Sequence, residues 1–295
     1  MLMFCRLTTL RPGMIKGVAA SDETNCIEKV AFLGPPGTFS NAAVDSYFGA
    51  GELPIRVSVS SIDDVFLEVE AGKAEFGLVP IENSTEGAVN NTQDCLIDTS
   101  LHIIGEVYLP IEHNLMVKGK QSFDKIKKIV SHKQSLAQCR LWLRSNFPHV
   151  QLEEASSNAE AARMASLDES VAAIAGAMAA QSYGLHILES GIQDRKNNTT
   201  RFLVLSQNRA KLSSGHDKTS ILVYTENKPG ALFRLLEPFD RFQVSLTRIE
   251  TRPARDGFWS YVFFIDFEGH IEDEPVRQVF AELADRVVKI KNLGS

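Results

Sequence analysis

The sequence predicts an α/β protein, with a two-lobed unit over residues 28–207 and a small α+β domain of the ferredoxin-like kind over residues 218–294. Strand and helix patterns alternate through the first segment, which is typical of a mainly parallel sheet. A polar stretch without periodicity, residues 208–217, then interrupts the pattern and is interpreted as a linker. A chain of 295 residues also fits two or three domains better than one.

The first segment begins with a strand over Lys29–Leu33, a glycine-rich turn and a helix that ends near residue 48. Ser61 is a typical N-cap for a second helix, whose apolar positions between Ile62 and Val69 recur at helical spacing. A buried strand over Phe76–Ile81 completes a strand–helix–strand order, which indicates a parallel sheet. Further strands are predicted at 103–108, 113–117, 126–130, 172–175 and 201–205, with helices around 136–147 and 178–183.

The second segment has the order strand, helix, strand, strand, helix within about 75 residues, which fits a ferredoxin-like domain. Its strands are predicted at Ser220–Thr225, Val244–Ile249 and Trp259–Phe267. The first helix follows Pro229, and the last one starts near Pro275, because proline is favoured in the first turn of a helix.

The composition argues against several classes of function. The net charge is −6, and Lys and Arg are spread along the chain, so nucleic-acid binding is not expected. The four cysteines show no metal-type spacing, so we expect no metal site, no disulfide framework and a cytoplasmic location. No apolar run is long enough to span a membrane, so no membrane association is expected. No dinucleotide or P-loop motif is complete, and no cofactor is predicted.

Residues 1–27 are predicted to form an N-terminal tail. They contain Arg6, Arg11 and Lys16 but no acid before Asp22, which also fits a transit peptide. An upstream start codon, with Met14 as the true start, is a further alternative. The first apolar residues are too few for a secretory signal.

Polar side chains gather near the ends of four predicted strands. The four clusters are Gly37–Ser40, Pro80–Ser84, Ser131–Gln134 and Asn197–Phe202. Ligands of an open parallel sheet bind beyond the carboxyl ends of its strands. The fourth cluster starts its strand, but a strand that returns antiparallel would bring it to the same cleft. Hydroxyls, amides and one arginine suit an anionic, oxygen-rich small molecule.

Each cluster, taken alone, also fits a structural role. Gly37–Ser40 fits a turn with a helix cap, and Glu82–Ser84 fits a second cap. His132 fits a structural hydrogen-bonding residue, and Arg201 fits a surface position at the start of a strand. Convergence of all four clusters on one cleft is therefore the property that would indicate a functional site.

Together the clusters resemble the signature motifs of the prephenate dehydratase family, and the match runs in the family's order from about Val30 to Leu293. The resemblance implies a periplasmic-binding-protein-like catalytic domain of two lobes and a C-terminal ACT regulatory domain. The motifs are Gly34-Pro35-Pro36-Gly37-Thr38-Phe39-Ser40, Pro80-Ile81-Glu82-Asn83-Ser84, Ser131-His132-Lys133-Gln134 with Gln138-Cys139, Thr200-Arg201-Phe202, and in the tail Pro229–Leu232 and Leu246–Pro253.

This resemblance implies a carbon–oxygen lyase that converts prephenate to phenylpyruvate without a cofactor, driven by aromatisation of the ring. A hydrogen-bond donor must lie near the leaving hydroxyl, and the resemblance assigns this role to Thr200. The charge of Glu82 would be unhelpful near a dianionic substrate unless the side chain faces away, and for Arg201 a structural role stays open. The implied catalytic residues are Thr200, Asn83, Gln138 and Ser131, and the implied substrate-binding residues are Thr38, Ser40, Glu82, Ser84, Thr199, Arg201 and Phe202.

The ACT resemblance implies feedback by L-phenylalanine at a subunit interface, and hence a homo-oligomer, either a dimer or a tetramer. Thr251 and Ser245 replace the Ser and Asn usual in the family, so a purely structural ACT domain stays open. Lys133 likewise replaces a usual proline, which predicts a looser loop. The implied effector-binding residues are Gly230, Ala231, Leu232, Ser245, Thr247, Glu250 and Thr251.

Three other functions remain open from the sequence. An arogenate dehydratase would use the same chemistry and yield phenylalanine directly. A two-lobed solute-binding protein would share the fold but would need a secretory signal. A regulatory ACT protein could have lost its activity, although the polar clusters are present. About 28 residues precede the first strand, too few for the helical chorismate mutase domain that many bacterial relatives carry.

Overall fold

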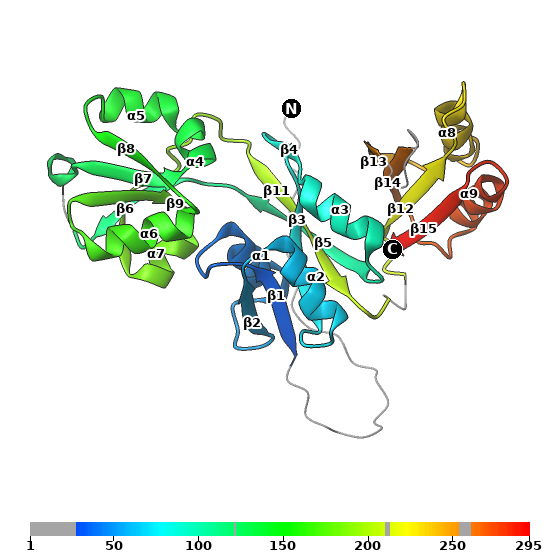
Figure 1. The fold of residues 1–295 in the computed structure, drawn as a ribbon, viewed down its shortest axis with the longest axis horizontal. Coiled ribbons are helices and arrows are strands. Elements are labelled where there is room, and N and C mark those ends of the chain that lie inside the picture. Colours follow the sequence, from blue (N-terminus) through cyan, green and yellow to red (C-terminus); the bar gives the residue numbers. More distant parts are fainter. Residues whose placement is uncertain (1–27, 121, 210–212, 254–260) are drawn as a thin grey trace, which may run out of the picture.

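The structure is a computed structural model, and it describes residues 28–120, 122–209, 213–253 and 261–295. The predicted N-terminal tail, residues 1–27, lies outside the described residues. Three sheets follow one another across the molecule, and lobe 1 lies between lobe 2 and the C-terminal domain (Figure 1).

Lobe 1 is built on a sheet of order β2-β1-β3-β11-β5, with the short β4 paired to β3. Strands β1, β2 and β3 are parallel, whereas β11 returns antiparallel between β3 and β5. Helix α1 covers one face, and α2 and α3 cover the other. The elements are β1 (Lys29–Leu33), α1 (Phe39–Phe48), β2 (Ile55–Val59), α2 (Ile62–Glu70), β3 (Phe76–Asn83), β4 (Gly87–Ala88), α3 (Asn90–Asp98), β5 (His102–Pro110) and β11 (Thr199–Ser206).

Lobe 2 is built on a sheet of order β10-β6-β9-β7-β8, and the chain crosses between the lobes at residues 111–113 and 190–198. Strands β7, β8 and β9 are parallel, and β6 and β10 are antiparallel to their neighbours. The elements are β6 (Asn114–Lys118), η1 (Phe123–Lys125), β7 (Lys128–His132), α4 (Lys133–Gln138), α5 (Arg140–Asn146), β8 (Gln151–Ala155), α6 (Asn158–Leu167), β9 (Val171–Ala175), α7 (Ala177–Tyr183) and β10 (Leu185–Glu189).

Three helices begin at a capping side chain, and two of these caps were predicted. The side chain of Thr38 accepts a hydrogen bond from the backbone N–H of Asn41 at the start of α1, and Ser61 caps α2 in the same way. Ser157 caps α6, a helix that the periodicity did not predict. Strands β2, β8 and β10 and helix α3 were also missed, and all four are short elements in which most residues stay at least partly exposed.

The C-terminal domain has an antiparallel sheet of order β13-β14-β12-β15, with α8 and α9 packed on one face. The predicted order lacked the last strand, β15, whose polar Lys289, Lys291 and Asn292 hide its strand character. The start of the predicted strand at Trp259 lies outside the described residues. The elements are β12 (Lys218–Thr225), α8 (Ala231–Arg241), β13 (Leu246–Pro253), β14 (Tyr261–Glu268), α9 (Glu274–Ala284) and β15 (Lys289–Gly294).

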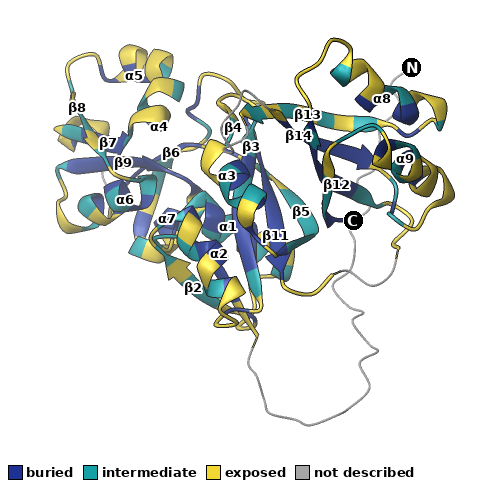
Figure 2. Cartoon of the chain, turned by 45° about the vertical axis from the view of Figure 1, so that its right-hand side comes forward, coloured by how far each residue is buried: buried dark blue, intermediate teal, exposed yellow. Residues whose placement is uncertain are grey.

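The other face of this C-terminal sheet packs against lobe 1. Leu222, Phe264 and Leu293 join Leu203 and Leu205 of β11 in one apolar cluster that spans both domains. Figure 2 shows the strands on both sides of this contact as buried, while the outer faces of the helices are exposed. Across the described ranges, no helix combines the length and apolar character that crossing a bilayer requires.

Candidate active site

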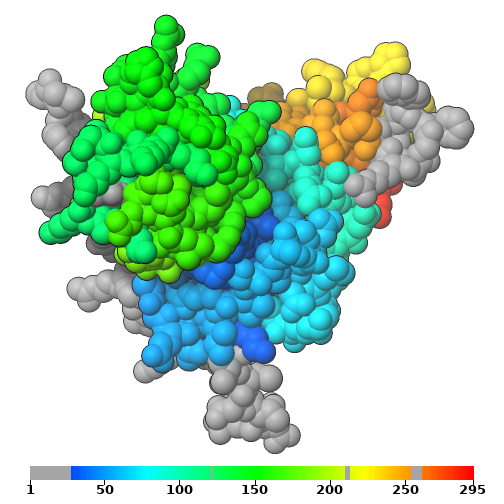
Figure 3. All heavy atoms as spheres, turned by 60° about the vertical axis from the view of Figure 1, so that its left-hand side comes forward, coloured from blue at the N-terminus to red at the C-terminus, as the bar shows by residue number. Residues whose placement is uncertain are grey.

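A cavity of about 420 Å³ lies between the two lobes, and all four predicted polar clusters contribute to it. Figure 3 shows lobe 2, in green, seated against the blue and cyan lobe 1. The predicted antiparallel return of β11 is confirmed, and it brings the start of this strand to the cavity. The lining residues are Phe39, Asn83, Glu86, Gly87, Ala88, Val89, Ile111, His113, His132, Gln134, Ser135, Gln138, Asn158, Asn198 and Thr200.

Thr200 and Asn83 form the central polar pair of this cavity. They are register partners on β11 and β3, and Asn83 Nδ2 donates a hydrogen bond of 2.8 Å to Thr200 Oγ1. Backbone N–H groups of Thr85 and Glu86 donate to Asn83 Oδ1 at 2.9 and 3.0 Å, which fixes the orientation of the amide. The Thr200 hydroxyl therefore receives a hydrogen bond, and its own hydrogen remains available to a ligand.

Gln138 ties the two lobes together across the cavity. It ends α4 of lobe 2, and its Oε1 accepts a hydrogen bond of 3.0 Å from Asn198 Nδ2 in the second crossing segment. Its Nε2 donates to Glu86 Oε1 of lobe 1 at 3.1 Å. Because Nε2 carries two hydrogens, one of them stays free for a ligand.

His113 supports Gln138 from the first crossing segment. Its Nε2 lies 3.0 Å from Gln138 Oε1, and because that oxygen can only accept, Nε2 carries the hydrogen. The ring is buried edge-on against Phe39, with centroids 5.6 Å apart. Burial lowers the pKa of His113, although the hydrogen bond with Gln138 opposes this shift. His113 is therefore held as a neutral imidazole.

The lobes also touch beside the cavity. Tyr183 of α7 donates a hydrogen bond of 3.3 Å from its hydroxyl to the backbone oxygen of Pro36. Gly176 lets the Phe39 ring approach lobe 2, because a Cβ atom added there would come within 2.7 Å of that ring. These two contacts, at the two ends of α7, hold the glycine-rich turn and the start of α1 against lobe 2.

Ser131 lies behind the cavity wall and does not line it. Its side chain is fully buried, and Oγ lies 2.6 Å from the backbone oxygen of Ile174 and 3.0 Å from Asn158 Oδ1. Ser135 Oγ and the backbone N–H of His132 also donate to Asn158 Oδ1, at 2.9 and 3.2 Å. With its oxygen fully engaged, Asn158 can offer only its amide NH₂ group to a ligand.

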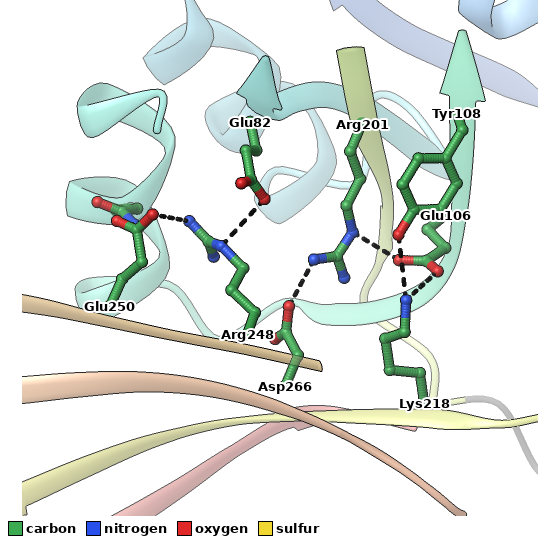
Figure 4. A network of polar contacts seen from close by, with 9 residues as sticks. Glu82, Glu106, Tyr108, Arg201, Lys218, Arg248, Glu250 and Asp266 are labelled. Carbon is green, nitrogen blue, oxygen red and sulfur yellow. Dashed lines mark hydrogen bonds and ion pairs between the residues drawn. The ribbon is translucent and has the colours of Figure 1, made fainter. Parts of the chain in front are cut away.

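Arg201 and Glu82, both predicted to bind substrate, point away from the cavity. The Arg201 guanidinium lies 2.6 Å from Glu106 and 2.5 Å from Asp266 of the C-terminal domain, and Glu82 pairs with Arg248 at 3.3 Å (Figure 4). Burial works against the charge of Arg201, but the carboxylates of Asp266 and Glu106 outweigh it and raise its pKa. Neighbouring side chains of a strand face opposite sides, which places these two residues opposite Thr200 and Asn83.

The family model described as prephenate dehydratase matches residues 30–210, and the model of the ACT domain matches residues 219–285. The chain belongs to the prephenate dehydratase family. It combines a prephenate dehydratase domain of two lobes with a C-terminal ACT domain.

Individual relatives agree with this assignment. The bifunctional chorismate mutase/prephenate dehydratase of Pseudomonas aeruginosa is 49% identical over 267 residues, which cover 90% of this chain and 72% of that protein. A prephenate dehydratase of Arthrobacter aurescens, solved in complex with L-Phe, superposes with a TM-score of 0.82 at 35% identity, covering 90% of this chain and 88% of that one. GqqA, described as a novel type of quorum quenching acylase, has a TM-score of 0.82 at 28% identity, covering 90% and 97%.

The remaining predicted residues of the prephenate dehydratase domain support the cavity from outside it. Thr38 caps α1, and Ser40 is buried in the first turn of that helix. Ser84 Oγ accepts a hydrogen bond of 2.9 Å from the backbone N–H of Thr199, which fixes the start of β11. Phe202 is packed in the core of lobe 1.

The residues of the ACT domain that were predicted to bind the effector lie on β13 and around the start of α8, with Ser245 just before β13. Thr247 and Thr251 are exposed on β13, whereas Glu250 faces lobe 1 and accepts a hydrogen bond of 3.0 Å from Gln93 Nε2. Gly230, at φ 77°, precedes α8, whose Leu232 is exposed. Ala231 and Ser245 line two different depressions of the domain surface.

Sequence reasoning missed three residues that shape the prephenate dehydratase cavity. Glu86, His113 and Asn158 line it, and none of them was named as a candidate. Asn158 had a detectable signal, because Ser157 and Glu160 have the capping-box spacing that marks the start of a helix. His113 and Glu86 act through Gln138, a contact between segments that the linear pattern does not contain.

Proposed function

We propose that the chain is a cofactor-independent lyase that converts prephenate to phenylpyruvate in phenylalanine biosynthesis. The observation that carries this proposal is the Thr200–Asn83 pair, which leaves the hydroxyl hydrogen of Thr200 available at a cavity whose amide and hydroxyl groups come from both lobes and whose lining includes one carboxylate, Glu86. Membership of the prephenate dehydratase family and the named activity of the Pseudomonas relative support it.

The reaction breaks two bonds of the substrate ring. As the ring carboxylate leaves as carbon dioxide, its bonding electrons move into the ring, and the hydroxyl at the opposite carbon departs and takes up a proton as water. Thr200 is placed to donate a hydrogen bond to the departing oxygen. A hydroxyl has no pKa near neutrality, so the net proton comes from solvent, and one preorganised donor contributes about 3–4 kcal/mol.

Neutral donors around the cavity are suited to hold the two substrate carboxylates. Gln138 and Asn158 each offer amide hydrogens from lobe 2, and Asn83 is fixed beside Thr200 by two backbone groups. A buried cation would stabilise the ring carboxylate more in the ground state than in the transition state, in which its charge is lost. Placing Arg201 outside the cavity avoids this penalty.

The ACT domain is proposed to bind L-phenylalanine and to assemble with a second copy of the chain. L-Phe is bound in the Arthrobacter relative. Strand β13 forms one edge of its sheet, and apolar Ile249, Leu232 and Phe233 are exposed nearby on β13 and α8. An exposed apolar surface of this kind is typical of an interface. A homo-oligomer, dimer or tetramer, and a cytoplasmic location are parts of the same proposal.

The test is product formation by purified protein. Phenylpyruvate formed from prephenate, with a rate that phenylalanine changes, is the expected result. Preferred turnover of arogenate would move the assignment to arogenate dehydratase, and no turnover of either compound would refute a dehydratase. Light scattering measures the number of chains in the assembly with and without phenylalanine, and a monomer under both conditions would contradict the proposed oligomer.

The likeness to GqqA calls for one control assay. Amide hydrolysis by a hydroxyl nucleophile needs a base that accepts the hydroxyl proton. Within the described residues, the hydroxyl of Thr200 is hydrogen-bonded to the amide N–H of Asn83, which donates to the hydroxyl oxygen and cannot accept its proton. We therefore expect no hydrolysis of an N-acyl amide substrate at the rate seen with prephenate.

A further inference from the structure

Strands β3 and β11 of lobe 1 carry different kinds of residue on the side of the cavity and on the side of the ACT domain. Thr200 lies opposite Asn83 in the β11–β3 register, and the next pair along is Arg201 opposite Glu82. The first pair hydrogen-bonds in the cavity, while the second reaches the ACT domain. The backbone that carries the reacting hydroxyl is thus continuous with the backbone that carries an inter-domain ion pair.

A second pair of charged residues, on the ACT sheet, faces Arg201 and Glu82. Arg248 of β13 is the register partner of Asp266 of β14. The two pairs bind crosswise, with Arg201 at 2.5 Å from Asp266 and Arg248 at 3.3 Å from Glu82, as Figure 4 shows. We call these four residues the ionic square.

The corners of the ionic square are not equally constrained. The side chains of Arg201, Asp266 and Arg248 are only 7%, 8% and 8% exposed, so solvent and salt screen their charges little. Arg201 is held tightly by Asp266 and Glu106. Arg248 is shared between Glu82 and Glu250, both at 3.3 Å, and its buried Nε and Nη2 atoms have no hydrogen bond to any residue that the structure describes. Arg248 is therefore the adjustable corner.

We propose that the ionic square positions the Thr200–Asn83 pair, and that Arg248 conveys the state of the ACT domain to it. This inference rests on the proposed function. Of the predicted effector residues, Thr247 directly precedes Arg248 on β13, and Glu250 forms an ion pair with it. A small shift of Arg248 changes the hold on Glu82 and, through the register of β3 and β11, the position of the Thr200 hydroxyl. Displacements of about 1 Å from productive geometry cost about 100-fold in rate.

Asp266→Asn tests the positioning role directly. It removes the charge with little change of shape, and Arg201 keeps Glu106, so the fold is expected to persist. We expect kcat for prephenate to fall about tenfold with KM nearly unchanged, because binding groups stay in place while the hydroxyl is misplaced. Glu282→Gln is the matched control, since it also removes an acid paired with arginine but lies wholly within the ACT domain. An unchanged kcat in Asp266→Asn would overturn the proposal.

A double variant separates positioning from general destabilisation. If Asp266 acts through Thr200, Asp266→Asn should lower kcat no further in the Thr200→Ala background. Equal fold losses in both backgrounds would overturn the proposal. Asp266→Glu should restore part of the rate by restoring the charge. If Asp266→Asn does not fold, Arg248→Gln carries the same comparison from the opposite corner.

The second part of the proposal, transmission through Arg248, is measured separately. The ratio of kcat with and without phenylalanine is measured for wild type and for Arg248→Gln, and the variant's ratio is expected to lie closer to one. Equal ratios in both proteins, whatever their value, would overturn the transmission through Arg248. A wild type inactive on prephenate refutes the proposed function itself, and this is seen before any variant is compared.

Discussion

The two sides of the β3–β11 strand pair hold opposite kinds of residue. Toward the cavity they present Thr200 and Asn83, which are neutral and bind each other through one hydrogen bond. Toward the ACT domain they present Arg201 and Glu82, whose charges are matched by Asp266 and Arg248. Adjacent residues of one motif thus serve different parts of the protein, and membership of a motif does not by itself place a residue at the substrate.

Physical chemistry accounts for the difference. In the cavity the substrate must lose its ring carboxylate and its ring hydroxyl. A hydrogen bond that becomes stronger as the hydroxyl leaves stabilises the transition state more than a fixed cation beside the carboxylate does. On the inter-domain side the charged groups of Arg201 and Asp266 are buried between two domains. A buried charge is tolerated only when it has a partner of opposite sign. The difference between the sides can be tested by removing one residue at a time.

Arg201→Ala should give the largest change in stability. It leaves Asp266 buried without its arginine, and breaking one side of a buried pair costs about 3–5 kcal/mol. Urea unfolding followed by two probes measures the loss. Arg277→Ala is the matched control, because its pair with Glu274 is exposed and its removal should cost less than about 1 kcal/mol. Equal losses in both variants would show that the inter-domain pair is no stronger than a surface one.

Thr200→Ala should give the largest change in turnover. We expect kcat to fall at least about 100-fold, which corresponds to about 2.7 kcal/mol of transition-state stabilisation. Unlike Arg201→Ala, it should leave the unfolding transition close to wild type, because no charge loses its partner. Thr200→Ser keeps the hydroxyl and should retain most of the rate. An alanine variant that retained most of its activity would remove Thr200 from the mechanism.

Ser131→Ala should give a smaller effect, mainly on stability. The buried hydroxyl of Ser131 on β7 bonds to the backbone oxygen of Ile174 on β9 and lies 3.0 Å from Oδ1 of Asn158 on α6. Its loss should therefore cost about 1–3 kcal/mol of unfolding free energy. Asn158 keeps two other donors on its oxygen, so kcat should fall less than in Thr200→Ala. Loss of turnover as large as in Thr200→Ala, with unfolding unchanged, would instead place Ser131 at the substrate.

The sequence could predict that Asn83 and Thr200 meet, because the end of β3 and the start of an antiparallel β11 lie at one edge of the sheet. Gln138 ends a helix of lobe 2, and only the family resemblance brought it into the same site. Strand alternation also implies that Arg201 and Glu82 face away once Thr200 and Asn83 face the cavity, although both were predicted to bind substrate. The sequence could not predict what they meet there, because the ACT sheet is held on that face by an apolar cluster formed from distant segments. Likewise β15 was missed because a short, lysine-rich edge strand carries almost no apolar alternation.

The smallest expected effect concerns His113, and it tests whether this buried imidazole is uncharged in the folded protein. Burial holds its pKa below the ordinary value of 6.5, so below that pH the unfolded chain binds more protons than the folded one. The contribution of His113 to the free energy of unfolding is therefore expected to be fully present above pH 6.5. It should be lost as the pH falls from there toward the lower pKa of the folded state. Measured against pH, this loss should be smaller in His113→Gln, whose amide can still donate to Gln138. The same pH dependence in both proteins would show that the imidazole is not held neutral. The contrast between uncharged donors in the cavity and ion pairs on the inter-domain side would then lose one of its supports.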